Sequence, residues 1–243
     1  MMDMQLPACF PDELLFSRIL RHFTLSGSRL TNYLEVYWGA RRASIHPLIT
    51  SGLSIFSSRA SENSEQLLHT QTLAPLFTYF LPSRAMLIKN AMLQGDCAAA
   101  LRACQLPSFK QHAPLVLKYC PICSEQDLRK YGVTYWHRVQ QIYGVTVCPK
   151  HRICLINKQV RGRARLSREL LPCTDGVLEE GSPEAIRFAR YAADLLKCLS
   201  AETVVFDANR YLLKLKERGY VTRGHRIRRK RVRRRMKLDR ISF

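Results

Sequence analysis

Two short motifs, Cys120-Pro-Ile-Cys123 and Cys148-Pro-Lys-His151, constrain the fold of this chain more than any other feature. Each motif places two soft metal ligands two residues apart, and twenty-four residues separate the motifs. Two such turns that face each other supply a closed tetrahedral Cys₃His set, which is the arrangement that structural zinc prefers. The spacing therefore predicts one zinc ion that stabilises the fold, with no coordination position left open for water.

Other side chains near the two motifs allow alternative interpretations. His137 and Cys154 are alternative metal ligands by residue type, although His137 lies far from either turn in the sequence. Three aromatic residues, Tyr135, Trp136 and Tyr143, lie between the motifs. Aromatic rings in this position pack over a small zinc site or stack on bases or on a protein partner, and we favour packing.

Basic residues dominate the charge of the chain and indicate a polyanionic partner. The 243 residues carry a net charge of +20, and Arg223 to Phe243 contributes half of it, with nine Arg and two Lys against one Asp. Such charge favours binding to nucleic-acid phosphates, although a solubilising tail is the alternative. The candidate DNA contacts are Arg161, Arg163, Arg165, Arg223, Arg226, Arg228, Arg229, Lys230, Arg231, Arg233, Arg234 and Arg235.

Composition also indicates a compartment. Hydrophobic residues make up 47% of the chain, yet no stretch reaches the roughly 18 apolar residues of a membrane span. The segment from Met1 to Asp12 carries two acids and no basic residue, unlike a signal peptide. The nine cysteines show no pairing pattern, so we expect the reducing cytoplasm and no membrane partner.

Hydrophobic periodicity predicts a mainly α-helical fold. Apolar residues at helical spacing favour helices in both halves of the chain, with a Ser-rich loop from Thr50 to Ser64 between the second and third helices. The predicted helices cover residues 12–27, 28–39, 65–80 (broken at Pro75), 83–95, 96–106, 182–199 and 207–219, with Ser28, Ser83, Asp96, Ser182 and Asp207 as N-caps.

These patterns divide the chain into five regions. Residues 1–112 form a helical N-terminal region, and 113–160 form a zinc module of a strand, a helix from Ser124 to Tyr131 and a strand from Ile153 to Ile156. A basic linker (161–181) follows. We interpret it either as a solvated loop or as a segment that contacts phosphates. The last two regions are helices (182–222) and an arginine-rich tail (223–243). The helices resemble a helix-turn-helix, because Gly219 forms a turn between a helix and a basic run.

Three stretches resemble the TniQ/TnsD family, in the order that this family has. They are Tyr119-Cys-Pro-Ile-Cys123 with Tyr131-Gly132, Tyr135-Trp136-His137-Arg138, Gln141 and Val147-Cys148-Pro149-Lys150-His151; the opening Phe10-Pro-Asp-Glu-Leu-Leu15 with Ser17; and His69-Thr70 through Leu73, Pro75, Leu76 and Phe80. The resemblance covers about the first 160 residues.

The resemblance implies a bacterial protein that selects targets for transposition. Members bind target DNA, or a CRISPR effector complex on that DNA, and recruit an AAA-type ATPase that brings in the transposase. Longer members continue past the end of this chain, so we expect a short, truncated or frameshifted member that associates with the nucleoid when it binds DNA. The alternatives are an adaptor to a CRISPR effector with only non-specific DNA contacts, and a zinc-containing transcription factor.

The sequence does not indicate an enzyme. It has neither the glycine-rich phosphate loop of an ATPase nor the His-Glu-x-x-His pair of a zinc hydrolase. A nuclease needs carboxylates gathered around catalytic metals, whereas the acids here, such as Asp12, Glu13, Glu125, Asp127 and Glu184, are expected at helix starts or on exposed faces. We therefore expect no catalytic residues.

Overall fold

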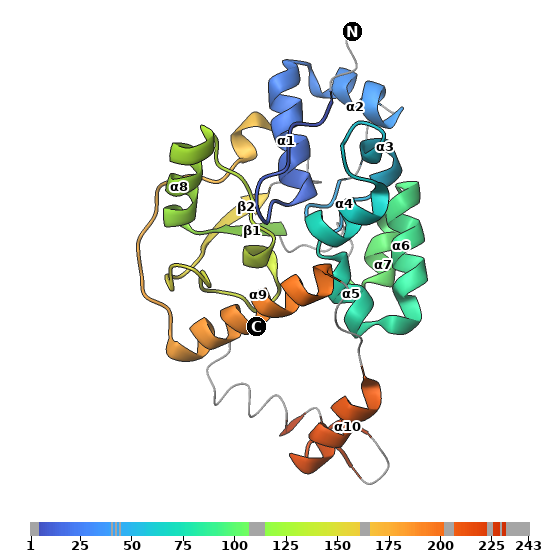
Figure 1. Cartoon of the computed structure of the whole chain (residues 1–243), viewed down its shortest axis with the longest axis vertical. Helices are drawn as coiled ribbons and strands as arrows, with labels where there is room; N and C mark the ends of the chain where they lie inside the picture. Colours follow the sequence, from blue (N-terminus) through green and yellow to red (C-terminus); the bar gives the residue numbers. More distant parts are fainter. Residues whose placement is uncertain are drawn as a thin grey trace.

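The computed structural model describes residues 5–39, 41, 43, 45–106, 115–160, 166–201, 207–222, 226–228, 230 and 231. Within these residues the chain forms ten α-helices and one two-stranded antiparallel sheet (Figure 1). The prediction of a mainly α-helical protein is confirmed. No α-helix in this described part is both long and apolar enough to cross a lipid bilayer.

Seven helices precede the sheet and surround most of the hydrophobic core. They are α1 (Leu15–Ser26), α2 (Leu30–Trp38), α3 (Leu53–Ser57), α4 (Ser64–Gln71), α5 (Ala74–Phe80), α6 (Ala85–Gln94) and α7 (Cys97–Ala103). The predicted break near Pro75 is present, because α4 ends before Thr72 and Pro75 lies in the first turn of α5, where its missing N–H is tolerated.

Several predicted boundaries in this half were wrong. The helix predicted from residue 12 begins at Leu15, because Glu13 pairs with His137 in an isolated β-bridge and Asp12 has a positive φ. The predicted loop from Thr50 to Ser64 contains the short helix α3, whose Leu53 and Phe56 are fully buried. Two buried side chains in one turn are too few to show helical periodicity in a Ser-rich segment.

Two of the predicted N-caps in this half were also wrong. Arg29 rather than Ser28 precedes α2, and Arg84 rather than Ser83 precedes α6 after a single 3-10 turn. Asp96 does cap α7, where its carboxylate accepts a hydrogen bond from the Ala99 backbone N–H at 2.9 Å. A serine near a helix start therefore predicts a cap only where its hydroxyl reaches a backbone N–H of the first turn.

The two-stranded sheet and α8 hold the metal-binding motifs. Strand β1 (Leu115–Tyr119) pairs with β2 (Ile156–Val160), with Leu115 opposite Val160. Helix α8 (Pro121–Tyr131) starts three residues before its predicted start, and β2 starts three residues after its predicted start. Residues that were assigned to the second strand, Ile153 and Cys154, form isolated bridges with Glu180 and Val147 instead.

Two helices follow the basic linker. Ser182 and Asp207 cap α9 (Pro183–Ser200) and α10 (Ala208–Glu217) as predicted, each accepting a backbone N–H from the third residue along. Figure 1 shows α9 along the lower edge of the main body, with α10 beyond it. The helix-turn-helix prediction is not confirmed, because the described residues after Gly219 form an antiparallel bridge between Val221 and Ile227.

One hydrophobic core joins regions that are distant in the sequence. It includes Leu6 and α1, the helices up to α7, Leu117 of β1, Trp136 and Leu196 of α9. The segment around Trp136 lies against the N-terminal region. The backbone carbonyl of Trp136 accepts the Leu14 N–H at 2.9 Å, and the Trp136 backbone N–H donates to the Ser17 hydroxyl at 3.0 Å. Since the side chain of Trp136 is fully buried, the metal-binding segment and the N-terminal helices stabilise each other.

Acid is expected to destabilise the fold through His46, which is 4% exposed. Its Nδ1 accepts the backbone N–H groups of Leu48 (3.2 Å) and Ile49 (3.4 Å), and burial lowers its pKa from 6.5 to about 4. Because the folded pKa lies below the unfolded one, the unfolded chain takes up this proton first as the pH falls. The contribution to stability is therefore complete above about pH 6.5 and is lost towards about pH 4.

Urea unfolding at about pH 7 and about pH 5 measures this effect, and His46 should account for a loss of about 2 kcal/mol between them. The variant His46→Asn keeps an acceptor near the position of Nδ1 but does not titrate. We expect it to lose about 2 kcal/mol less than the wild type over the same interval. Equal losses in the two proteins would contradict the assignment.

Candidate metal centre

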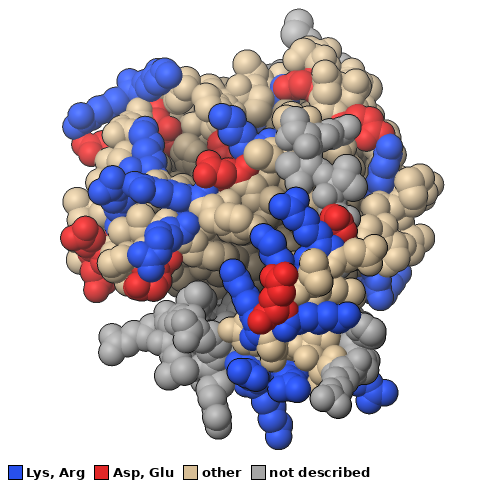
Figure 2. All heavy atoms as spheres, turned by 60° about the horizontal axis from the view of Figure 1, so that its bottom comes forward, with Lys and Arg blue, Asp and Glu red and all other residues tan. Residues whose placement is uncertain are grey.

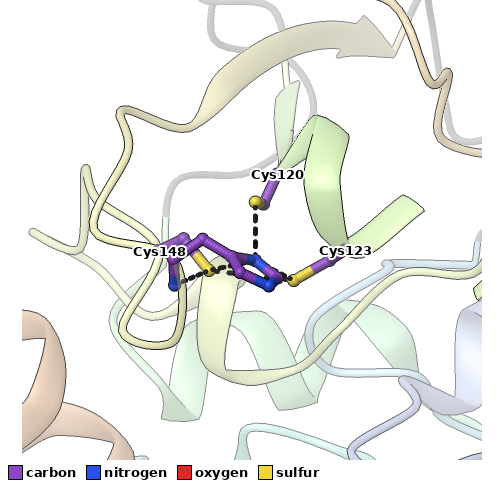
Figure 3. Close-up of side chains that lie close together, drawn as sticks. Cys120, Cys123 and Cys148 are labelled. Carbon is purple, nitrogen blue, oxygen red and sulfur yellow. Dashed lines mark hydrogen bonds between the residues drawn. The ribbon is translucent and has the colours of Figure 1, made fainter. Parts of the chain in front are cut away.

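Cys120, Cys123, Cys148 and His151 come together as predicted. Their ligand atoms all lie within 4.8 Å of one another. The Cys123 and Cys148 sulfurs are 3.7 Å apart, and the Nδ1 atom of His151 lies 3.4, 3.3 and 3.7 Å from the sulfurs of Cys120, Cys123 and Cys148. Figure 3 shows the three labelled cysteines directed toward one small volume from the start of α8 and from the second motif.

These distances fit a tetrahedral metal ion. Zinc–sulfur bonds of about 2.3 Å and zinc–nitrogen bonds of about 2.0 Å place neighbouring ligand atoms about 3.5 to 3.8 Å apart in a tetrahedron. The Cys123–Cys148 sulfur distance and the three His151 Nδ1–sulfur distances, 3.3–3.7 Å, lie close to this range, and the ligand atoms are at most 4.8 Å apart. The Nε2 atom of His151 faces away and is buried, with no hydrogen-bond partner in the described part of the chain. The four residues are therefore arranged to hold one metal ion with no open coordination position.

The electrostatics of the site also favour a cation. Hydrogen bonds from the sulfurs of Cys120 and Cys123 lower the pKa of Cys148 to about 2, and the backbone N–H groups of His151 and Lys150 act in the same direction. Hydrogen bonding to its two neighbours and burial raise the pKa of Cys123. The neighbouring thiols and burial thus disfavour ionising all three cysteines together, and a bound cation would offset this cost.

Local backbone structure sets the positions of the ligands. Cys120 ends the β1 segment, and the first turn of α8, begun by Pro121, carries Cys123 back toward it. In the second motif the Cys148 N–H donates to the Ile153 carbonyl at 2.8 Å, which closes the loop around His151. Gly181 lies against this loop, where an added Cβ would meet the Val147 side chain at 2.3 Å.

The alternative ligands lie outside the cluster. The Nε2 atom of His137 is 2.7 Å from the Asp127 carboxylate, and the sulfur of Cys154 is 3.9 Å from the Glu180 carbonyl oxygen. Tyr135 and Trp136 are buried in the protein, which agrees with a packing role, whereas Tyr143 remains 55% exposed.

Two of the acids that were expected at helix starts or on exposed faces are buried instead. Glu13 is fully buried, where its carboxylate accepts two hydrogen bonds from the Arg21 guanidinium at 2.8 Å. Asp127 is 7% exposed and pairs with His137. The partners are eight and ten residues apart in the sequence, outside the three- and four-residue spacing of pairs within a helix, so helical periodicity carries no signal for these pairs. The acids Glu125 and Glu184 are on the surface as expected.

The predicted DNA contacts are only partly within the described residues. Arg226, Arg228, Lys230 and Arg231 are exposed near the bridge between Val221 and Ile227. The other candidates lie outside the described residues: Arg161, Arg163, Arg165, Arg223, Arg229, Arg233, Arg234 and Arg235. Their contacts with DNA stay a prediction.

The fold and the site define a helical protein built around a buried Cys₃His cluster. The sequence profile of the TniQ family matches residues 5–155, which include all four cluster residues. Because this match covers more than half of the chain, the protein belongs to the TniQ family. The resemblance drawn from the motifs is therefore confirmed.

A bacterial relative extends the comparison. Transposon Tn7 transposition protein TnsD of Escherichia coli is 26% identical to this chain over 155 residues. The aligned part is 60% of this chain but 30% of that protein. The chain thus spans about a third of the length of this curated relative.

Proposed function

We propose that this protein selects target sites for a Tn-type bacterial transposon. It contacts target DNA and recruits an AAA-type ATPase, which in turn brings in the transposase. The observation that carries the proposal is the family match over residues 5–155 together with the similarity to a transposition protein. In this role the protein acts in the bacterial cytoplasm and on the nucleoid.

Zinc is the metal that we propose for the Cys₃His cluster. Three thiolates and one imidazole suit zinc better than they suit magnesium or calcium, which prefer oxygen ligands. A closed site of this kind stabilises a fold and does not activate water. The proposed role of the protein is therefore binding and recruitment, and catalysis is left to the transposase.

The N-terminal helices are the part that we propose as the recruiting region. They belong to the matched region, and they share their core with the segment around the metal cluster. A rigid body of this kind presents a fixed surface to a partner at little cost in conformational entropy. The basic residues beyond residue 160 then supply contacts with DNA.

Selection from a pool of genomic DNA fragments tests the proposal. The purified protein is incubated with the pool at about physiological salt, and the bound fragments are sequenced with and without an AAA-type transposition ATPase. Enrichment of one short sequence by the protein alone, and retention of the ATPase on those fragments, are the expected results. Retention of the ATPase on no fragment at all would refute the recruiting role.

The adaptor function predicts a different outcome of the same experiment. If binding occurs without enrichment, another component selects the site, such as a CRISPR effector complex, and this protein only holds the DNA. The net charge of +20 favours contacts of this sequence-independent kind. A gene neighbourhood without an ATPase and a transposase would favour the transcription-factor alternative.

A further inference from the structure

In the described residues, helix α10 is followed by two short segments, 220–222 and 226–228, which pair antiparallel as the two arms of a small hairpin. Helix α10 ends in a left-handed Gly219, whose N–H donates to the Lys216 carbonyl, while the Tyr220 N–H donates to the Leu215 carbonyl at 2.9 Å. These two bonds form a Schellman motif, which reverses the chain direction at a helix end. The chain therefore leaves the helix as an extended segment and not as a second helix.

The hairpin returns the chain to the end of α10. The Thr222 N–H donates to the Arg226 carbonyl at 2.9 Å, and the Arg228 N–H donates to the Tyr220 carbonyl at 2.8 Å. These bonds bring Arg231 back to the helix end, where its guanidinium lies 3.4 Å from the position of a Cβ added to Gly219. A cation distant in the sequence thus lies beside the last turn of α10.

Three cations form a stripe along α10. Arg210, Lys214 and Arg218 are exposed and lie four residues apart, so that they share one face of the helix. At about 1.5 Å of rise per residue, the stripe is about 12 Å long. Figure 2, which turns the lower end of Figure 1 forward, shows Lys and Arg side chains gathered over this end of the molecule.

The stripe is electrostatically unfavourable in the protein alone. None of the ion pairs among the described residues includes Arg210, Lys214 or Arg218. Like charges four residues apart destabilise a helix by about 0.2–0.5 kcal/mol a pair. Residues 207–231 contain ten Lys and Arg against two acids, Asp207 and Glu217, which lie three residues from Arg210 and Lys214 and offset only part of this repulsion. A polyanion that bound this face would remove the repulsion.

We propose that the α10 stripe, defined as Arg210, Lys214 and Arg218, contacts the phosphate backbone of duplex DNA, and that Arg231 extends this contact at the helix end. The proposal rests on the proposed function, because it assigns part of the DNA contact to three helix residues that are absent from the contacts predicted from the sequence. A line of exposed cations binds phosphates, which carry no sequence information. The stripe therefore provides affinity and orientation, and target selection resides elsewhere.

The salt dependence of DNA binding tests the stripe. The probe is a short fluorescent duplex of fixed sequence, and its affinity for the full chain is measured by anisotropy between about 50 and 200 mM salt. The triple variant Arg210→Gln, Lys214→Gln, Arg218→Gln should flatten the slope of log K against log salt by about 2 to 3. Circular dichroism checks that the variant keeps its helical content.

A second triple variant controls for the loss of net charge. Arg102→Gln, Arg129→Gln, Lys130→Gln removes three exposed cations from α7 and α8 and should leave the slope nearly unchanged. An unchanged slope in the stripe variant, or an equal change in both variants, would overturn the assignment while leaving the proposed function intact. Failure of the wild-type chain to bind any duplex would refute both proposals.

Discussion

Substitution of Cys123 by serine is expected to release the metal ion and to unfold the segment between the two motifs. The sulfur of Cys123 lies within 3.7 Å of both Cys148 and His151, so its loss removes a central member of the cluster. Zinc binding to a structural site supplies apparent free energies of about 10–16 kcal/mol in isolated zinc fingers, and this energy is coupled to folding. We expect bound zinc to fall from about one ion per chain to nearly none, as measured by atomic emission of the purified protein.

The effect on stability should extend beyond the cluster. The segment between the motifs includes Trp136, which is fully buried in the core shared with the N-terminal helices. A loss on the order of 5 kcal/mol would lower the thermal midpoint of a chain of this size by about 10–20 °C. Differential scanning calorimetry measures this shift.

Cys154→Ser is the matched control for Cys123→Ser. It makes the same chemical change at a partly exposed cysteine that lies in the same region but outside the cluster. We expect this variant to keep both its zinc and its thermal midpoint. If Cys123→Ser kept them as well, the four residues would have no role in metal-dependent folding.

Local signals explain which features could be predicted from the sequence. The spacing within each motif places two ligands in one turn, and that geometry is independent of the remaining fold. The caps Asp96, Ser182 and Asp207 act on N–H groups three residues away, so their effect is also local. Each of these features was predicted from fewer than about five consecutive residues and is present in the structure.

Features that depend on tertiary contacts could not be predicted in this way. Glu13 was expected at a helix start or on an exposed face, but it lies in a buried pair with Arg21 and in a bridge with His137. Arg210 and Lys214 were predicted only as part of a helix. Their relation to Arg231 depends on the hairpin that brings Arg231 to the end of that helix, and this is a tertiary contact. Sequence separation hides such pairs, since nothing in the spacing of the residues predicts which partner the fold provides.

Arg138 joins three parts of the fold that are distant in the sequence. Its side chain is almost fully buried and donates to the carbonyls of His69 (2.8 Å) and Thr72 (3.4 Å). It also donates to the Asp12 carboxylate at 3.4 Å and to the Ser200 hydroxyl at the end of α9 at 2.8 Å. One guanidinium thus connects the N-terminal segment, the end of α4 and the last turn of α9.

The variant Arg138→Met should therefore be strongly destabilised. Methionine fills much of the volume but leaves the carbonyls of His69 and Thr72 without this donor and Asp12 without its cation. Removing one partner of a fully buried ion pair costs about 3–5 kcal/mol, and because the Asp12 side chain is 30% exposed we expect a cost toward the lower end of that range. Burial already raises the pKa of Asp12 and Arg138 opposes that shift, so the carboxyl should take up a proton at higher pH in the variant. Chemical denaturation measures the loss of stability.

Two further variants test whether the ion pair between Arg138 and Asp12 accounts for the loss of stability in Arg138→Met. Arg129→Met removes an exposed arginine whose ion-pair partner among the described residues is Glu125 on the same helix, and it should cost less than about 1 kcal/mol. In a double-mutant cycle, Asp12→Asn combined with Arg138→Met should cost at least about 1 kcal/mol less than the sum of the single variants, because each single change strands the other partner. Strict additivity would mean that Arg138 acts through the two carbonyls and Ser200 alone. A cost below about 1 kcal/mol for Arg138→Met would mean that this side chain does not hold the three segments together.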